Sequence, residues 1–276
     1  MALVGTLLGA CGGGGSGGTA APAATPAVAT VTGKFVDATV VGLSYKCNGA
    51  TSVSGTTNSI GEYTCPEGKP VAFYVGDILI GTVSAPMAVV TPLDLVGAGA
   101  GPANITVSNI VRFLMSISST NPATGVLTIA PAVTVAAAGK TADFTANTAI
   151  ALDALIALVK PGATVFTNAQ ATTHVTGSLG GLFAGNYGGT FSGGGTGTWS
   201  VSISSSGVVS GTATDNNGSA PVNGTIATTL STGSTYGFVG TAGAAAWVGT
   251  LNISTKAFSG NWTNGQFSGT FTGAAR

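Results

Sequence analysis

The chain has 276 residues, of which only 6% are charged and 45 are glycine. Eight basic and eight acidic side chains cancel to a formal net charge of zero, so the chain lacks the concentrated positive charge that binding to nucleic acid requires. The longest apolar runs, such as 71–80, are interrupted by Asp77 and are shorter than the roughly 20 residues of a membrane-spanning helix. The composition therefore excludes a nucleic-acid-binding protein and a protein that crosses a membrane with helices.

The N-terminus predicts a cellular address. Residues 8–11 read LGAC, and a Gly/Ser tract, 12–18, follows, which resembles the lipobox and tether of a bacterial lipoprotein. The resemblance implies that Cys11 is acylated, that the chain is cut just before it, and that residues 12–30 form a flexible tether. Glycine rather than aspartate follows the cysteine, which implies an outer-membrane or cell-surface address. The alternative is an ordinary apolar N-terminus that carries a cysteine, because residues 1–10 are too short and uncharged for a complete signal peptide; this also leaves the start codon open.

Two further cysteines, Cys47 and Cys65, are separated by a turn-rich segment. In an exported protein such an even pair predicts one structural disulfide between neighbouring strands. A metal site is the alternative, but a lone pair of cysteines without nearby histidine does not complete the four ligands that zinc prefers. We therefore expect a disulfide and no metal.

Residues 31–95 alternate short β-branched and aromatic runs with Gly, Asn and Pro turns, which predicts four to seven strands in a small β-sandwich. The order of five segments is distinctive: GKFVD at 33–37, VGLSY at 41–45, NSIGEY at 58–63, FYVGD at 73–77 and VTPLDL at 90–95. This series resembles the N-terminal module of proteobacterial surface lipoproteins and adhesin-like proteins, a carboxypeptidase-regulatory-like or transthyretin-like β-sandwich.

The resemblance continues to about residue 180. Relatives often carry an acidic, calcium-binding loop at the position of residues 116–122, but this chain has no carboxylate there. A hard cation requires such oxygen ligands, so the resemblance implies no calcium site.

Residues 96–184 carry helical patterns. Apolar residues recur at helical spacing over two stretches, namely Val107, Ile110, Val111, Leu114 and Ile117, and then Ile150, Leu152, Leu155, Ile156 and Val159. These stripes are interpreted as core faces, with a partner-binding groove as the alternative. His174, the only histidine, lies in a third predicted helix. No Ser, Cys or carboxylate stands beside it in the sequence, which favours a surface or packing role over acid–base chemistry.

Residues 185–276 carry a repeated pattern: a large apolar residue, any residue, glycine, any residue and an apolar residue. Because strand side chains alternate between faces, the three marked positions share one face, and Ser, Thr and Asn occupy the other. Turn signals separate about eight such strands. The repeats are Val209-Gly211-Ala213, Val222-Gly224-Ile226, Phe238-Gly240-Ala242, Trp247-Gly249-Leu251, Phe258-Gly260-Trp262 and Phe267-Gly269-Phe271.

This pattern predicts an antiparallel, eight-stranded up-and-down β-barrel or a curled meander. Glycine on the concave side allows sharp bending and leaves room for aromatic rings from neighbouring strands. An outer-membrane barrel is the less favoured alternative, because its outward face would carry hydroxyls where lipid requires an apolar band. Residues 197–212 resemble the opening hairpin of avidin-like barrels, but that family's ligand contacts cannot be matched here, so biotin is not implied.

The expected fold is therefore mainly β, with a small N-terminal β-sandwich, a helical extension and a C-terminal barrel. The expected organisation is a truncated signal peptide and lipobox over 1–11, a tether over 12–30, the sandwich module over 31–95, a helical segment over 96–184 and the barrel or meander over 185–276.

Catalysis is not expected. The only charged residues after 184 are Asp215, Lys256 and Arg276, which cannot form paired carboxylates, a catalytic triad or a metal cage. An enzyme in the earlier part would need several groups to converge in one cleft, and no spacing predicts this; the candidates are Asp37, Glu62, Asp77, Asp94 and His174.

Two functions remain. The first is a lipid-anchored structural or adhesive module of the cell surface, without catalysis, that meets glycans or surface proteins through its hydroxyl-rich strands. The alternative is a ligand-binding barrel in which Trp199, Trp247, Phe258 and Trp262 line a pocket for a small apolar molecule or a glycan. If no pocket exists, the same rings simply fill the interior. Neither function requires a cofactor.

Overall fold

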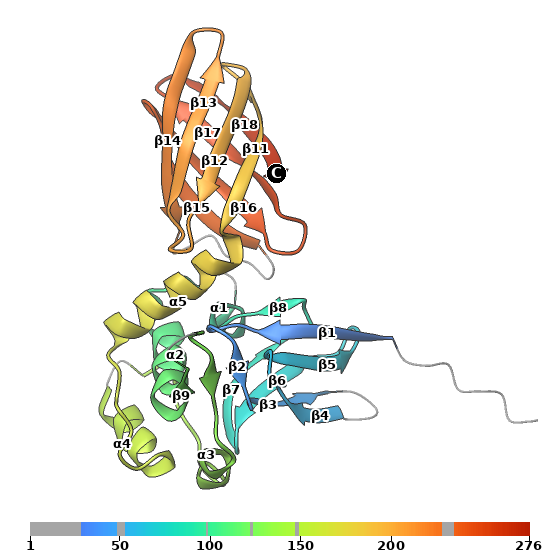
Figure 1. Cartoon of the computed structure of the whole chain (residues 1–276), viewed down its shortest axis with the longest axis vertical. Coiled ribbons are helices and arrows are strands. Elements are labelled where there is room, and N and C mark those ends of the chain that lie inside the picture. Colours follow the sequence, from blue (N-terminus) through green and yellow to red (C-terminus); the bar gives the residue numbers. More distant parts are fainter. Residues whose placement is uncertain (1–28, 49–52, 98, 122–123, 147–148, 228–234) are drawn as a thin grey trace, which may run out of the picture.

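The computed structural model describes residues 29–48, 53–97, 99–121, 124–146, 149–227 and 235–276 (Figure 1). Cys11 and residues 12–28 of the predicted tether lie outside the described residues, and Thr30, placed at the end of that tether, instead begins a strand. The described chain forms a lower part of small sheets and helices and an upper barrel, with one long helix leading from the first to the second (Figure 1). The expected fold class, mainly β with a closed antiparallel eight-stranded barrel after smaller N-terminal sheets, is confirmed.

The N-terminal part contains two main sheets. One has the order β4-β3-β6-β7 and the other has the order β5-β1-β8. In the described part of the chain eight strands precede residue 92, more than the four to seven predicted, because two of them are only two residues long. The strands are β1 (Thr30–Phe35), β2 (Val40–Val41), β3 (Ser44–Cys47), β4 (Val53–Thr56), β5 (Glu62–Pro66), β6 (Val71–Val75), β7 (Ile78–Val83) and β8 (Val89–Val90).

The predicted disulfide between Cys47 and Cys65 is present. Both cysteines are fully buried, and their Cα atoms lie 5.6 Å apart. The prediction that it joins neighbouring strands is wrong in one respect: Cys47 ends β3 and Cys65 lies in β5, and these strands belong to different sheets. The bond therefore joins the two sheets across the core. Both cysteine side chains point into the core, which brings the two sulfurs together.

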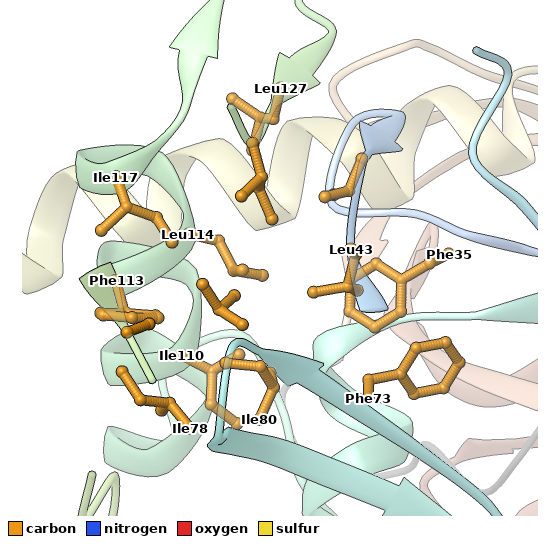
Figure 2. Close-up of a cluster of buried hydrophobic side chains, with 14 of the residues drawn as sticks. Phe35, Leu43, Phe73, Ile78, Ile80, Ile110, Phe113, Leu114, Ile117 and Leu127 are labelled. Carbon is orange, nitrogen blue, oxygen red and sulfur yellow. The ribbon is translucent and has the colours of Figure 1, made fainter. Parts of the chain in front are cut away.

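Helices cover the open side of this core. Figure 2 shows Ile110, Phe113, Leu114 and Ile117 of α2 in one cluster with Phe35, Phe73 and Ile80 of the N-terminal sheets. The elements between the sandwich and the barrel are α1 (Pro92–Val96), α2 (Ile105–Ile117), β9 (Ser119–Thr120), β10 (Leu127–Thr128), α3 (Pro131–Ala136), α4 (Ala149–Val159) and α5 (Asn168–Phe183). Strands β9 and β10 join β2 in a third small sheet with the order β2-β10-β9.

The three predicted helices are all present, as α2, α4 and α5. The buried face of α2 includes all five residues of the predicted stripe. In α4 the stripe is partly wrong, because Ile150 is 81% exposed while Leu152, Ile156 and Val159 are buried. Ile150 lies in the first turn of the helix, where the described residues leave its side chain exposed. None of the helices in the described part of the chain is long and apolar enough to cross a membrane.

The barrel consists of eight antiparallel strands, each paired with the next, and β18 pairs with β11 to close the ring. Its interior is apolar, as the repeat predicted: the first large residue of each repeat is buried except Phe267, which is 60% exposed at one end. The strands are β11 (Gly185–Gly193), β12 (Gly197–Ile203), β13 (Val209–Asp215), β14 (Gly218–Ile226), β15 (Thr235–Ala242), β16 (Ala245–Asn252), β17 (Ala257–Asn264) and β18 (Phe267–Ala275).

The repeated glycines make room for rings, as predicted. A Cβ on Gly224 would lie 2.4 Å from the Trp247 ring, and one on Gly249 would lie 2.5 Å from the Phe271 ring. A Cβ on Gly273 would lie 2.4 Å from the Trp199 ring. Each ring therefore spreads over a glycine of another strand, which is how a barrel of eight strands accommodates so many aromatic side chains.

Helix α5 supports one end of the barrel. Its Phe183 ring contacts Tyr236 and Phe238 inside the barrel, at 5.2 and 5.3 Å between ring centroids. Lys256 Nζ, from the turn between β16 and β17, donates to the Leu182 carbonyl at 2.7 Å, where a cation also complements the negative end of the helix dipole. The base of the barrel is thus closed by apolar packing and by a charged cap.

The contact between α5 and the barrel can be tested with two adjacent glycines. A Cβ on Gly180 would lie 2.4 Å from the Ser205 carbonyl oxygen, whereas a Cβ on Gly181 would meet no atom within 4 Å. Gly180→Ala is expected to lower the free energy of unfolding by about 1–3 kcal/mol, because the clash is with backbone. Gly181→Ala is expected to raise it by about 0.5–1 kcal/mol, because alanine favours the helix. Urea denaturation measures both, and equal effects would contradict this contact.

Candidate binding site at the open end of the barrel

The two ends of the barrel differ: the end next to α5 is called the base, and the opposite end is called the mouth. Because α5 leads directly into β11, the odd-numbered strands run away from the helix and the even-numbered strands return toward it. The turns that follow β11, β13, β15 and β17 therefore surround the end distant from α5, which is the upper end in Figure 1. Phe267 lies at this mouth, directly after the last of these turns.

The mouth opens into a cavity of about 610 Å³. The four residues proposed from the sequence, Trp199, Trp247, Phe258 and Trp262, all line it, together with Phe191 and Phe271. Pockets that hold small molecules are typically concave, mostly apolar and of about 300–1,000 Å³. The interior is therefore filled at the base and hollow at the mouth, a combination that neither sequence alternative stated.

Phe258 forms the floor of the cavity. Its ring lies 5.5 Å from Phe238 on the base side and 5.5–5.9 Å from Trp199, Trp247 and Phe271 on the mouth side, between centroids. Most of these pairs meet edge to face, the geometry that aromatic rings prefer. At 2% exposure, Phe258 is the best buried of the four proposed residues, so its ring separates the packed base from the hollow mouth.

The cavity exists because small residues replace large ones on one side of the mouth. Along β13, β14 and β15 the inward positions near the mouth are Ala213, Ala220 and Ala242, and all three line the cavity. Toward the base, β14 and β15 carry the larger residues Ile226, Tyr236 and Phe238, which are buried and do not line the cavity. The sequence carried this signal, since alanine occupies the mouth position of two repeats.

The indole N–H groups of the cavity differ in their partners. Trp199 Nε1 donates to the Thr190 carbonyl and Trp262 Nε1 donates to the Ser192 carbonyl, both at 3.2 Å. These bonds fix two rings against β11. Trp247 Nε1 is buried, and the described residues provide it with no acceptor, so that ring is held by packing alone.

A second cluster joins the sandwich to the base of the barrel. Tyr236 Oη donates to Asp94 Oδ2 at 2.9 Å and lies 2.7 Å from Thr91 Oγ1, which also donates to Asp94 Oδ2. Burial raises the pKa of Asp94, although these donors oppose the rise, and burial raises the pKa of Tyr236 well above its usual value. The cluster caps α1. We assign it a structural role, because its groups are hydrogen-bonded to one another and do not face the cavity.

His174 has a carboxylate partner that the sequence did not reveal. Its Nε2 lies 3.3 Å from Asp37 Oδ1 and 3.4 Å from the Asp37 carbonyl oxygen. Burial raises the pKa of Asp37. Burial also favours the neutral imidazole, but the contact with Asp37 outweighs this and raises the pKa of His174. Two segments 137 positions apart form the pair, so no local pattern could have indicated it.

The acid–base candidates from the sequence do not converge. Asp37 meets His174, but Asp94 lies in the α1 cluster, Glu62 faces Lys34, and Asp77 accepts from the Gly139 backbone N–H. Among the described residues, no three His, Cys, Asp or Glu side chains lie close enough to hold a metal ion. Within the described part of the chain, the candidates from the sequence that converge in one place are therefore the four aromatic residues of the cavity.

The class of protein that this fold and cavity define is a closed, eight-stranded up-and-down barrel that is blind at one end. Comparisons with protein-family models, with curated proteins and with solved structures gave no match.

Proposed function

We propose that the barrel binds a small, largely apolar ligand in the cavity at its mouth. The observation that carries the proposal is the cavity itself, a space of about 610 Å³ with aromatic walls and a floor formed by Phe258. A barrel whose rings only filled its interior would leave no such space. The alternative retained from the sequence is that aromatic stacking holds a glycan in the same place.

A neutral fluorescent probe tests the proposal. All three tryptophans of the chain line the cavity, so N-phenyl-1-naphthylamine bound there is expected to quench their emission by energy transfer, saturably and at one probe per chain. Binding to cell-surface glycans without any effect of the neutral probe would contradict the proposal and favour an adhesive module.

Two neighbouring positions on β15 provide a matched pair of variants. Ala242 lines the cavity, and Thr241 is exposed on the outer face. Ala242→Leu fills part of the space and is expected to weaken probe binding by about tenfold, equivalent to about 1.4 kcal/mol. Thr241→Leu adds a similar apolar group outside and is expected to leave binding unchanged. Equal effects of the two variants would place the probe on the surface.

We further propose, from the sequence, that the protein is a non-catalytic lipoprotein held at the outer membrane or cell surface through Cys11. In cells fed labelled palmitate, the native protein is expected to take up the label and the Cys11→Ala variant to lose it. Label that persists in the variant would contradict a lipid anchor on Cys11 and, with it, the proposed surface location. A surface location would place the mouth of the barrel within reach of molecules outside the cell.

The adhesive module remains the second candidate because of the outer face of the barrel. Strands β16, β17 and β18 line a shallow hollow with hydroxyl and amide side chains, namely Thr250, Ser259, Asn261, Thr270 and Thr272. Such neutral polar groups suit glycan contacts, although β-propensity alone also explains rows of threonine.

A further inference from the structure

The polar groups of the cavity lie at its rim, the edge of the barrel mouth formed by the strand ends distant from α5. Among the described residues that line the cavity, Asp215 alone is charged. It ends β13 on the inward face, two positions after Ala213, and so continues that face to the mouth. Its carboxylate accepts from the Asn217 backbone N–H at 2.7 Å and from Asn217 Nδ2 at 3.2 Å. These two bonds fix the carboxylate and leave it partly exposed at the rim.

Aromatic rings stand beside this carboxylate. Gly197 is the cross-strand partner of Asp215, and the Phe191 ring lies over Gly197, where a Cβ would be 2.6 Å from Phe191 Cζ. Trp262 meets Phe191 edge to face, with 6.1 Å between the ring centroids. The absence of a side chain at Gly197 therefore brings a negative charge and two π systems to the same part of the rim.

The two cationic residues of the barrel lie away from this rim. Lys256 Nζ is bonded to the Leu182 carbonyl at the α5 end. Arg276 follows β18, and its backbone N–H donates to the Asn186 carbonyl near the start of β11, also at the α5 end. The mouth consequently carries one negative charge, and the described part of the chain places no Lys or Arg side chain in the cavity lining to offset it.

We infer that the cavity selects an organic cation, an apolar body that carries a quaternary or tertiary ammonium group, over neutral and anionic molecules of the same shape. The apolar body occupies the cavity above Phe258, and the ammonium group lies at the rim, between Asp215 and the π faces of Phe191 and Trp262. Aromatic faces attract cations through their quadrupole, and most strongly when water is excluded. A carboxylate or sulfate head group in the same place would be repelled by the Asp215 carboxylate and would have no cationic side chain to pair with. This inference rests on the proposed function, since it names the class of ligand for the same cavity.

Three probes with the same chain length test the inference: decyltrimethylammonium, decanol and decanoate, each below the concentration at which it forms micelles. Each displaces N-phenyl-1-naphthylamine from the native protein. The ammonium compound is expected to bind about tenfold more tightly than decanol, and decanoate is expected to bind most weakly. Equal affinities, or tighter binding of decanoate, would overturn the inference while leaving an apolar site in place. If neither the naphthylamine nor any of the three binds, the proposed function fails as well.

Two charge-removing variants locate the effect. Asp215→Asn keeps an oxygen that can accept from Asn217 and removes the charge, so the preference for the ammonium compound over decanol is expected to fall to about twofold or less, with decanol affinity unchanged. Glu67→Gln removes one negative charge from an exposed turn of the sandwich and is expected to leave the preference intact. A preference that survives Asp215→Asn would assign selectivity to the rings alone and contradict the role of the carboxylate.

Discussion

Replacing Phe258 with alanine is expected to lower the free energy of unfolding by about 3–5 kcal/mol, the range measured for deleting a buried aromatic ring. Phe258 is 2% exposed and contacts Tyr187, Trp199, Phe238, Trp247 and Phe271. Neighbouring strands cannot collapse into the vacated space, because the barrel is closed by hydrogen bonds around its circumference. Denaturation in urea, followed by tryptophan fluorescence, reports on the barrel specifically.

Phe267 provides the matched control for this ring. It belongs to the same repeat pattern on the next strand, but it is 60% exposed at the mouth. Phe267→Ala is expected to change stability by about 0.5 kcal/mol or less. If Phe258→Ala were no more destabilising than Phe267→Ala, the ring of Phe258 would not form a packed floor, and the cavity would have to extend into the base.

Loss of the Cys47–Cys65 disulfide is expected to lower the free energy of unfolding by about 3 kcal/mol. The two cysteines are 18 positions apart, and in the chain-entropy model a crosslink over such a loop removes about this much free energy from the unfolded chain. The Cys47→Ser, Cys65→Ser double variant measures the effect by urea denaturation followed by far-ultraviolet circular dichroism. The N-terminal sheets are expected to lose structure at lower urea than in the native protein.

Reduction of the native protein is the control for that variant. A thiol reductant is expected to shift the native protein toward the double variant and to leave the double variant unchanged, because only the native protein has this bond to lose. A native protein with the same unfolding midpoint in the presence and absence of reductant, and with reactive thiols at both positions before reduction, would show that the bond does not form in solution.

The barrel could be predicted from the sequence because its information is local. Alternation along each strand assigned all three marked positions of a repeat to the same face, and the spacing of Gly207, Gly218 and Gly265 divided the strands. These glycines all have positive φ within or next to turns, a conformation that other residues adopt at a cost. Residue type and spacing therefore predicted both the number of strands and the inward direction of Trp199, Trp247 and Phe258.

The sandwich was less predictable because its pairing is not local. Strand β1 pairs with β5 and with β8, and β2 pairs with β10 more than eighty positions later. Two-residue strands carry almost no periodic signal. The sequence could therefore indicate that Cys47 and Cys65 pair, but only the packing of two sheets shows that the bond crosses the core.

The sequence by itself determined about eight antiparallel, glycine-rich strands with one apolar face and the four aromatic residues on that face, because alternation between faces is a property of neighbouring residues. Only the pairing of β18 with β11 decided that these strands close into a barrel and not into a curled meander. Only the tertiary structure decided that the base is packed and the mouth hollow, because that depends on which end α5 closes and on where Ala213, Ala220 and Ala242 come to lie around the ring. The tertiary structure also decided that Asp215 stands beside Phe191, since the two meet across a glycine that belongs to neither strand.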